Sequence, residues 1–163
     1  MATPQSRPDF TLQIRRTFAA PREKVFAAWT QQEQLEKWMC RDVAAHTVIH
    51  RRQDIRTGGR YLMEVRDTAK NEVYWGQGVY LEVAPPEKLR FTWSWTKDRP
   101  EGENMHPGAE QTEVAVEFHD HGSTTELILT HTGFKNEKLR KEHDGGWNGC
   151  FEILEGVLRQ SHS

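Results

Sequence analysis

The stretch GVYLEVAPPEKLRFTWSW, residues 78–95, restricts the fold more than any other part of the chain. Apolar and polar residues alternate on both sides of the pair Pro85 and Pro86, as in strands with one buried face. Neither proline can donate a backbone hydrogen bond to a sheet, and Pro86 restricts Pro85 to an extended conformation. We therefore expect a hairpin with the prolines at its turn. Its second strand would direct a row of large side chains inward: Leu89, Phe91, Trp93 and Trp95.

The same two-residue period extends from Val43 to about His131, interrupted by the turn sequences RTGGR, APPEK and DHGST. This pattern predicts a run of antiparallel strands. Before it, FTLQIRRTF (residues 10–18) alternates like an opening strand. Pro21 suits a first helical turn, and the spacing of the apolar residues after it predicts two short helices that end near Met39.

The carboxy-terminal segment gives the clearest helical pattern. Trp147 is the centre of a broad apolar stripe that also contains His143, Cys150, Phe151, Leu154 and Leu158. Gly145, Gly146, Gly149 and Gly156 interrupt it, and each costs about 1 kcal/mol relative to alanine inside a helix. We expect either a late helix start near Trp147 or close packing at the glycines. The alternative is backbone flexibility beside a pocket mouth.

These elements predict an α+β fold in which the last helix lies across a curved antiparallel sheet and two short helices follow the first strand. The chain of 163 residues has the length of one domain. We expect a single domain over residues 10–160, preceded by a disordered tail at residues 1–9. Residues 97–110 are polar and rich in Pro and Gly, as in a loop between strands.

Charge and hydropathy exclude several classes of partner. The net charge of −2 provides no general attraction to nucleic acid or to anionic lipid. The longest apolar run, VFAAW, is far shorter than the roughly 18–20 residues that cross a bilayer, and the amino terminus has no signal-peptide pattern. We expect a cytoplasmic protein without membrane insertion. Cys40 and Cys150 have no C-x-x-C partner, which favours free, buried thiols.

Three polar side chains fall on faces that are otherwise apolar: Gln77, His131 and His143. Alternation places Gln77 in an inward row with Val73, Trp75, Val79, Leu81 and Val83. A later hairpin would point Val114, Val116, Phe118, Leu127, Leu129 and His131 inward. A buried polar group without a partner costs about 1–3 kcal/mol, so each needs a protein group, a water or a ligand. A satisfied core and an amphipathic cavity are both compatible with this pattern.

Motifs of the main enzyme classes are absent from the sequence, including G-x-S-x-G, G-x-x-x-x-G-K, G-x-G-x-x-G and H-E-x-x-H. His119 and His121 could bind a metal, but DHGS is typical of a solvated hairpin turn. Asp144 diverges from His143 by about 100° on a helix and cannot easily orient its ring for base catalysis. The basic run HRRQDIR, residues 50–56, is interpreted as a solvated strand edge or loop. We assign no catalytic residue, metal ligand or cofactor.

Five motifs in order give the chain a resemblance to a known family. They are RTFAAPREKVFAAWTQQEQLEKWM, DIRTGGRY, GVYLEVAPPEKLRFTW, TELILTHTGF and HDGGWNGCFEIL. Together they resemble the homologues of the activator of the Hsp90 ATPase, within the START-like or SRPBCC superfamily. The resemblance implies a helix-grip fold with a hydrophobic cavity in many members. The chain departs from relatives at residues 38–41, where WMCR replaces a Trp-Trp-Gly-Pro type sequence.

The leading hypothesis is non-enzymatic binding of a small apolar or amphipathic ligand between the last helix and the sheet. The resemblance implies two alternatives: a chaperone partner in a stress response, or a cyclase-like or aromatase-like enzyme in which cavity histidines, Tyr80 or Glu64 move protons. An uncovered edge strand would permit a homodimer. The residues expected to bind the ligand are Trp38, Trp75, Gln77, Trp93, Trp95, His131, His143, Trp147 and Phe151.

Overall fold

The computed structural model describes residues 10–41, 44–97 and 111–160, and its strands form one antiparallel sheet in the order β1-β7-β6-β5-β4-β3-β2. The helices are α1 (Arg22–Thr30), α2 (Gln32–Trp38) and α3 (Glu137–Gln160). This architecture confirms the predicted α+β, helix-grip fold. The strands are β1 (Phe10–Phe18), β2 (His46–Gln53), β3 (Arg60–Asp67), β4 (Glu72–Ala84), β5 (Lys88–Thr96), β6 (Thr112–His121) and β7 (Thr124–Phe134).

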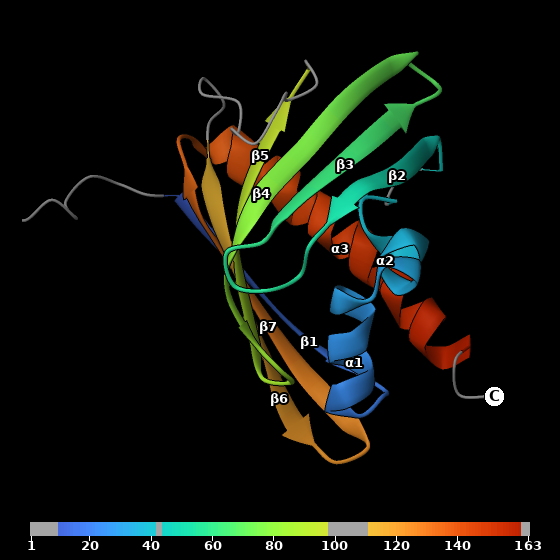
Figure 1. The fold of residues 1–163 in the computed structure, drawn as a ribbon, viewed down its shortest axis with the longest axis vertical. Helices are drawn as coiled ribbons and strands as arrows, with labels where there is room; N and C mark the ends of the chain where they lie inside the picture. Colours follow the sequence, from blue (N-terminus) through green and yellow to red (C-terminus); the bar gives the residue numbers. More distant parts are fainter. Residues whose placement is uncertain (1–9, 42–43, 98–110, 161–163) are drawn as a thin grey trace, which may run out of the picture.

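The sheet curves around α3, which crosses its inner face diagonally (Figure 1). The helix α1 contacts β6 and β7, and α2 contacts β2 and α3. The edges of the sheet are β1 and β2. The expected tail at residues 1–9 and nearly all of the loop at residues 97–110 lie outside the described residues, so the division into a tail and a single domain stays a prediction.

The core is built around Trp29 of α1. The centroid of its ring system lies 4.8 Å from that of Trp38 and 5.9 Å from that of Trp147. Trp38 also donates its indole N–H to the carbonyl oxygen of Ala28 at 2.9 Å, which fixes α2 against α1. Aromatic side chains bury on the order of 150–250 Å² each, so a few of them hold three helices on one sheet.

The hairpin expected around Pro85 and Pro86 is confirmed. The strands β4 and β5 pair as far as Ala84 and Lys88, and the backbone N–H of Glu87 closes the turn on the carbonyl oxygen of Ala84 at 2.7 Å. The second strand faces α3 as expected: Leu89, Phe91 and Trp93 belong to the core, and Trp95 packs against it partly buried. The inward row of the later hairpin is also buried as expected.

The expected inner face of β4 is wrong over residues 73–79. Tyr61 and Met63 of β3 belong to the core, and their partners on β4 are Gly78 and Gly76. Because cross-strand partners share a face, the even-numbered residues of β4 face α3 here. Because glycine has no side chain, the alternation of apolar and polar residues in the sequence did not reveal this inner face.

Trp75 and Gln77 consequently lie on the outer face of the sheet, opposite Glu64 and Leu62 of β3. They stand outside the core cluster that α3 covers, although Trp75 is 8 % and Gln77 only 1 % exposed. Both amide atoms of Gln77 are buried and have no hydrogen-bond partner among the described residues. A register shift farther along β4 returns Val83 to the core side, as expected for a strand with a bulge.

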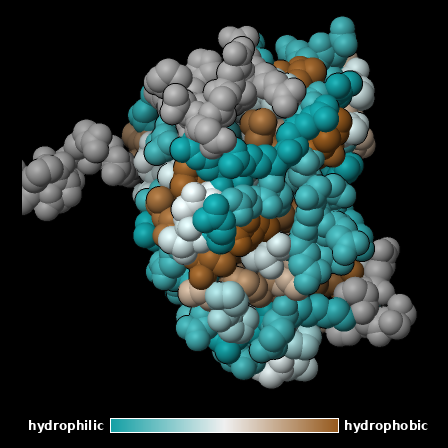
Figure 2. Space-filling model, viewed as in Figure 1, coloured by the Kyte–Doolittle hydropathy of each residue, from teal (hydrophilic) through white to brown (hydrophobic). Residues whose placement is uncertain are grey.

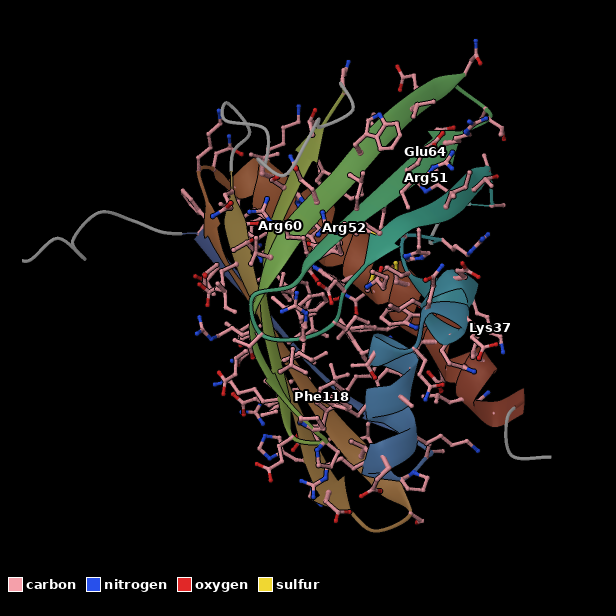
Figure 3. All side chains as sticks on the ribbon, in the orientation of Figure 1. Lys37, Arg51, Arg52, Arg60, Glu64 and Phe118 are labelled. Atoms are coloured by element: carbon pink, nitrogen blue, oxygen red, sulfur yellow. The ribbon has the colours of Figure 1, made fainter. Side chains whose placement is uncertain are left out.

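Charged side chains occupy the outer face near Glu64, which is 4 % exposed. Its Oε1 accepts hydrogen bonds from Nε and Nη2 of Arg51 at 3.0 and 2.7 Å, and its Oε2 accepts one from Nε of Arg66 at 2.7 Å. Figure 3 shows Glu64 beside Arg51, with Arg52 on the same face. Arg51 and Arg52 are exposed, as expected for the basic run, but His50 is buried.

The helix α3 begins at Glu137, so the expected late start near Trp147 is wrong. Oδ1 of Asn136 accepts a hydrogen bond from the backbone N–H of Leu139 at 2.9 Å and caps the helix. Close packing does not explain Gly145 or Gly156, because a Cβ at either would meet no atom within 4 Å. The apolar stripe around Trp147 is buried as expected from Cys150 to Leu158.

Candidate ligand-binding cavity

A cavity of about 390 Å³, called the main cavity below, lies between α3 and the strands β3, β4 and β5. This volume falls within the roughly 300–1,000 Å³ of small-molecule pockets. The wall is mostly apolar, with polar groups at His46, Tyr74, Glu142 and His143. The other lining residues are Met39, Cys40, Val65, Trp93, Trp95, Leu139, Gly146, Trp147 and Cys150. Figure 2 shows hydrophobic surface gathered at the centre of an otherwise mostly hydrophilic face.

One side of α3 supplies half of this wall. Its lining residues recur at intervals of three and four, the spacing of one helical face: Leu139, Glu142, His143, Gly146, Trp147 and Cys150. Gly146 lies in the middle of this face and carries no side chain. Gly146 borders the cavity, and the expected backbone flexibility beside a pocket mouth stays a prediction.

The opposite wall depends on Gly76 of β4. A Cβ there would lie 2.9 Å from Cε of Met63 and 3.1 Å from Cζ3 of Trp95. Both distances are shorter than ordinary van der Waals contact, so the glycine lets the Trp95 ring lie against β4. Trp95 in turn meets Trp93 edge to face at a centroid distance of 5.5 Å, which forms a continuous aromatic surface.

His143 supplies a polar group on this wall. Its Nδ1 lies 2.9 Å from the carbonyl oxygen of Leu139. Since a carbonyl only accepts, Nδ1 carries the proton, and Nε2 of the neutral ring is an acceptor. No described residue is hydrogen-bonded to Nε2. The ring packs against Phe134 at a centroid distance of 4.8 Å, which holds it in place.

His131 lies behind the wall rather than in it. It is 0 % exposed, and both ring nitrogens have partners: Trp147 Nε1 at 3.1 Å and Thr112 Oγ1 at 2.7 Å. Desolvation by burial, aided by the nearby His143, lowers the pKa of His131 to about 3. The ring is therefore neutral near pH 7 and is not available to a ligand as a base.

A second, smaller space of about 20 Å³, called the inner cavity below, adjoins the main cavity at Met39 and Trp93, which line both. It lies between the helices α1 and α2 and the strands β2 to β5. Its other lining residues are Trp29, Leu35, His50, Gln53, Tyr61, Met63, Tyr80 and Phe91. Several of these carry polar atoms, unlike most of the main cavity.

The residues expected to bind a ligand fall into three groups. Trp93, Trp95, His143 and Trp147 line the main cavity. Fully buried core positions behind it hold Trp38, His131 and Phe151, each 0 % exposed. Trp75 and Gln77 lie on the outer face of β4 and do not face α3. The structure thus brings together part of the expected set around one cavity.

Several lining residues were missed. Met39 and Cys40 follow α2 in an irregular segment, where no period predicts orientation, and Cys40 has a positive φ of 61°. His46 begins β2, where its Nε2 lies 3.6 Å from Oδ2 of Asp67. Both cysteines are buried thiols outside any disulfide, as expected, and both line the main cavity. Tyr74 was missed because the inner face of β4 was assigned incorrectly from the sequence.

The residues near the turn between β6 and β7, considered above as a metal site, form ordinary structural contacts. Nε2 of His119 lies 2.9 Å from Oε1 of Glu117, and Asp120 accepts the backbone N–H of Gly122 in the turn. Among residues 10–41, 44–97 and 111–160, no group of three or more His, Cys, Asp or Glu could hold a metal ion. None of the described helices is long and apolar enough to span a membrane.

A family model described as "Activator of Hsp90 ATPase homolog 1-like protein" matches residues 19–159, nearly the whole helix-grip fold. The chain belongs to this family. Comparison with curated proteins gave no match. The family assignment agrees with the resemblance drawn from the five motifs.

Solved structures show the same fold at low sequence identity. Protein CV1439 from Chromobacterium violaceum has a TM-score of 0.77 at 21 % identity, with 91 % of this chain and 97 % of that chain covered. A protein from Arthrobacter aurescens has a TM-score of 0.76 at 18 % identity, covering 92 % and 86 %. The AHSA1-like protein from Aeromonas hydrophila has a TM-score of 0.71 at 17 % identity, covering 94 % of each chain.

Proposed function

We propose that this member of the family binds a small apolar or amphipathic molecule in the main cavity, without catalysis. The observation that carries the proposal is the cavity of about 390 Å³ between α3 and the sheet, with its tryptophan wall. Removing apolar ligand surface from water stabilises a complex by about 25 cal/mol per Å². Nε2 of His143 would accept a hydrogen bond from an amphipathic ligand.

Filling the cavity from α3 tests the proposal. In Gly146→Leu the new side chain projects from the middle of the lining face into the main cavity, and the helix gains up to about 1 kcal/mol in propensity. We expect the variant to stay folded and to lose binding of 2-ethylnaphthalene, measured by equilibrium dialysis. Gly145→Leu is the matched control, because that exposed residue lies on the far side of the helix and has open space.

The binding results for the three proteins distinguish the main cavity from any other site. Binding of 2-ethylnaphthalene by the wild type and by Gly145→Leu, but not by Gly146→Leu, supports the main cavity as the site. Equal binding by all three proteins places the probe elsewhere and overturns the proposal. Native mass spectrometry of gently purified protein would in addition reveal a molecule retained from the cell.

Activation of the Hsp90 ATPase is the second candidate, because the matched family is described by that activity. It would act through the protein surface, so Gly146→Leu should stimulate ATP turnover as well as the wild type does. Unchanged turnover on addition of the wild type, with no detectable complex, would argue against it. No observation favours the enzyme alternative, since His131, its expected base, is enclosed by its own hydrogen bonds.

A further inference from the structure

The inner cavity is bordered by polar atoms whose hydrogen-bonding capacity is unused. Nε1 of Trp29, Nε1 of Trp93 and Nε2 of His50 are buried and have no partner in the part of the chain that is described. These residues are 2 %, 6 % and 7 % exposed, and all three line the inner cavity. One such atom costs about 1–3 kcal/mol, so three around one small space indicate a place for a bound polar group.

The donors and acceptors can be assigned from the neighbours of these atoms. Nδ1 of His50 lies 3.3 Å from Oε1 of Gln53, which only accepts, so Nδ1 carries the proton and Nε2 is an acceptor. Nε2 of Gln53 donates to the hydroxyl of Tyr80 at 3.0 Å, which leaves the Tyr80 proton free to be donated. The indoles of Trp29 and Trp93 are donors only. The cavity therefore offers more donors than acceptors.

Size and charge restrict what can bind there. About 20 Å³ exceeds the roughly 10–15 Å³ needed for one water-sized group but not the space for a ring. None of the described residues that border the inner cavity is Lys or Arg. Desolvation by burial lowers the pKa of His50, which keeps that ring neutral. A carboxylate would therefore be buried without a counter-charge among these lining residues, which is costly.

The inner cavity and the main cavity share two lining residues, Met39 and Trp93. Methionine is flexible and adapts to irregular contacts, so Met39 can move aside for a substituent of one or two atoms. An apolar body in the main cavity could thus extend a short polar substituent inward. A larger charged head group would have to stay at the polar rim near His46 and Glu142.

We propose that the inner cavity receives the hydroxyl or carbonyl oxygen of a neutral ligand whose apolar body occupies the main cavity. The inference rests on the proposed function and assigns its ligand class: neutral aromatic or alicyclic molecules with one short oxygen substituent, rather than carboxylic acids. The oxygen accepts from the indole N–H groups of Trp29 and Trp93, and a hydroxyl also donates to His50.

Three probes that share one ring system test this class: 2-ethylnaphthalene, 2-acetylnaphthalene and 2-naphthoate. We expect the ketone to bind roughly three- to tenfold more tightly than the hydrocarbon, the value of one net hydrogen bond. Naphthoate at pH 8 should bind at least tenfold more weakly than the ketone. Binding of the hydrocarbon tests the proposed function, and the ratio between probes tests the inner cavity.

Two variants test whether the preference for the ketone arises in the inner cavity. Trp29→Phe removes one donor and should reduce the ratio of ketone affinity to hydrocarbon affinity. Trp95 lines the main cavity but not the inner cavity, so Trp95→Phe should change the affinities for both probes by about the same factor. Equal binding of ketone and hydrocarbon by the wild type, or tighter binding of naphthoate, overturns the inference. Binding of none of the probes overturns both proposals.

Indole N–H resonances give a readout that needs no variant to fold. The ketone, but not the hydrocarbon, should shift the N–H signals of Trp29 and Trp93 downfield. Trp38 serves as an internal reference, because its N–H group already donates to Ala28 and its side chain lines neither cavity. A ketone shift no larger than that of Trp38, or no shift that distinguishes the ketone from the hydrocarbon, would contradict the inference.

Discussion

The indole N–H of Trp147 donates a hydrogen bond to Nδ1 of His131 across 3.1 Å and joins α3 to β7. Because Nδ1 accepts, the proton of the neutral ring is on Nε2, which lies 2.7 Å from Oγ1 of Thr112. The Thr112 hydroxyl in turn donates to the carbonyl oxygen of Trp93 at 3.1 Å. This chain of hydrogen bonds links α3 to three neighbouring strands and leaves no acceptor for a second proton on the imidazole.

Acid should therefore destabilise the protein through His131. Burial lowers its pKa to about 3, whereas an unfolded chain has a histidine pKa of about 6.5. Between these values the unfolded state binds one more proton, so the free energy of unfolding falls by up to about 1.4 kcal/mol for each pH unit below 6.5. Urea unfolding between pH 7 and pH 4 measures this loss.

His131→Gln is the control for that titration, since glutamine keeps a polar side chain but binds no proton. We expect the variant to be less stable than the wild type at pH 7. The difference in their free energies of unfolding should decrease as the pH falls toward 4. His50 is present in both proteins, so its own titration cancels. If the difference in the free energy of unfolding stays constant over this pH range, His131 does not control the acid sensitivity.

Much of the fold follows from side-chain periods. The hairpin around Pro85, the opening strand and the stripe around Trp147 were predicted correctly, because large apolar side chains mark the buried face. The inner face of β4 was not, since Gly76 and Gly78 occupy it without a side chain. The start of α3 was also missed, because its first turns are polar and glycines follow.

Gly78→Ala should unfold or severely destabilise the protein. A Cβ there would lie 2.0 Å from the carbonyl oxygen of Thr92 and 2.5 Å from the hydroxyl of Tyr61. That hydroxyl donates to the same carbonyl at 2.6 Å, so neither group can move without breaking the bond. We expect a loss of about 3 kcal/mol or more in urea unfolding.

Gly145→Ala provides the comparison on an exposed helix surface. Nothing lies within 4 Å of its Cβ position, and alanine favours the helix by about 1 kcal/mol. This variant should raise the free energy of unfolding. A similar loss in both variants would mean that the close approach at β4 is not the cause.

The cavity was less predictable than the fold, because its wall combines segments with different periods. Trp93 and Trp95 followed from the alternation of β5, and His143 and Trp147 from the face of α3. Met39 and Cys40 follow α2 in an irregular segment, where side-chain orientation depends on tertiary contacts. The inner cavity could not be predicted from the sequence, since His50 lies within a basic run whose arginines are exposed.

Glu64→Gln tests the charge cluster on the outer face. Burial alone would raise the pKa of Glu64, but hydrogen bonds from Arg51 and Arg66 outweigh it, so the pKa lies below its ordinary value. The resulting stability is fully present above the unfolded pKa of about 4.3 and is lost as the pH falls through the folded value. Because both arginines are about half exposed, we expect the variant to lose only about 1–2 kcal/mol at pH 7.

High salt and low pH should both reduce the difference in the free energy of unfolding between the wild type and Glu64→Gln. Salt screens the exposed arginines, and as the pH falls through the lowered pKa of Glu64, protonation of the carboxylate removes the charge that glutamine lacks. Glu117→Gln, which breaks only an exposed contact with His119, should change the free energy of unfolding by less than about 0.5 kcal/mol. If the two variants lose equal stability in urea at pH 7, burial of Glu64 between its arginines contributes nothing beyond a surface ion pair.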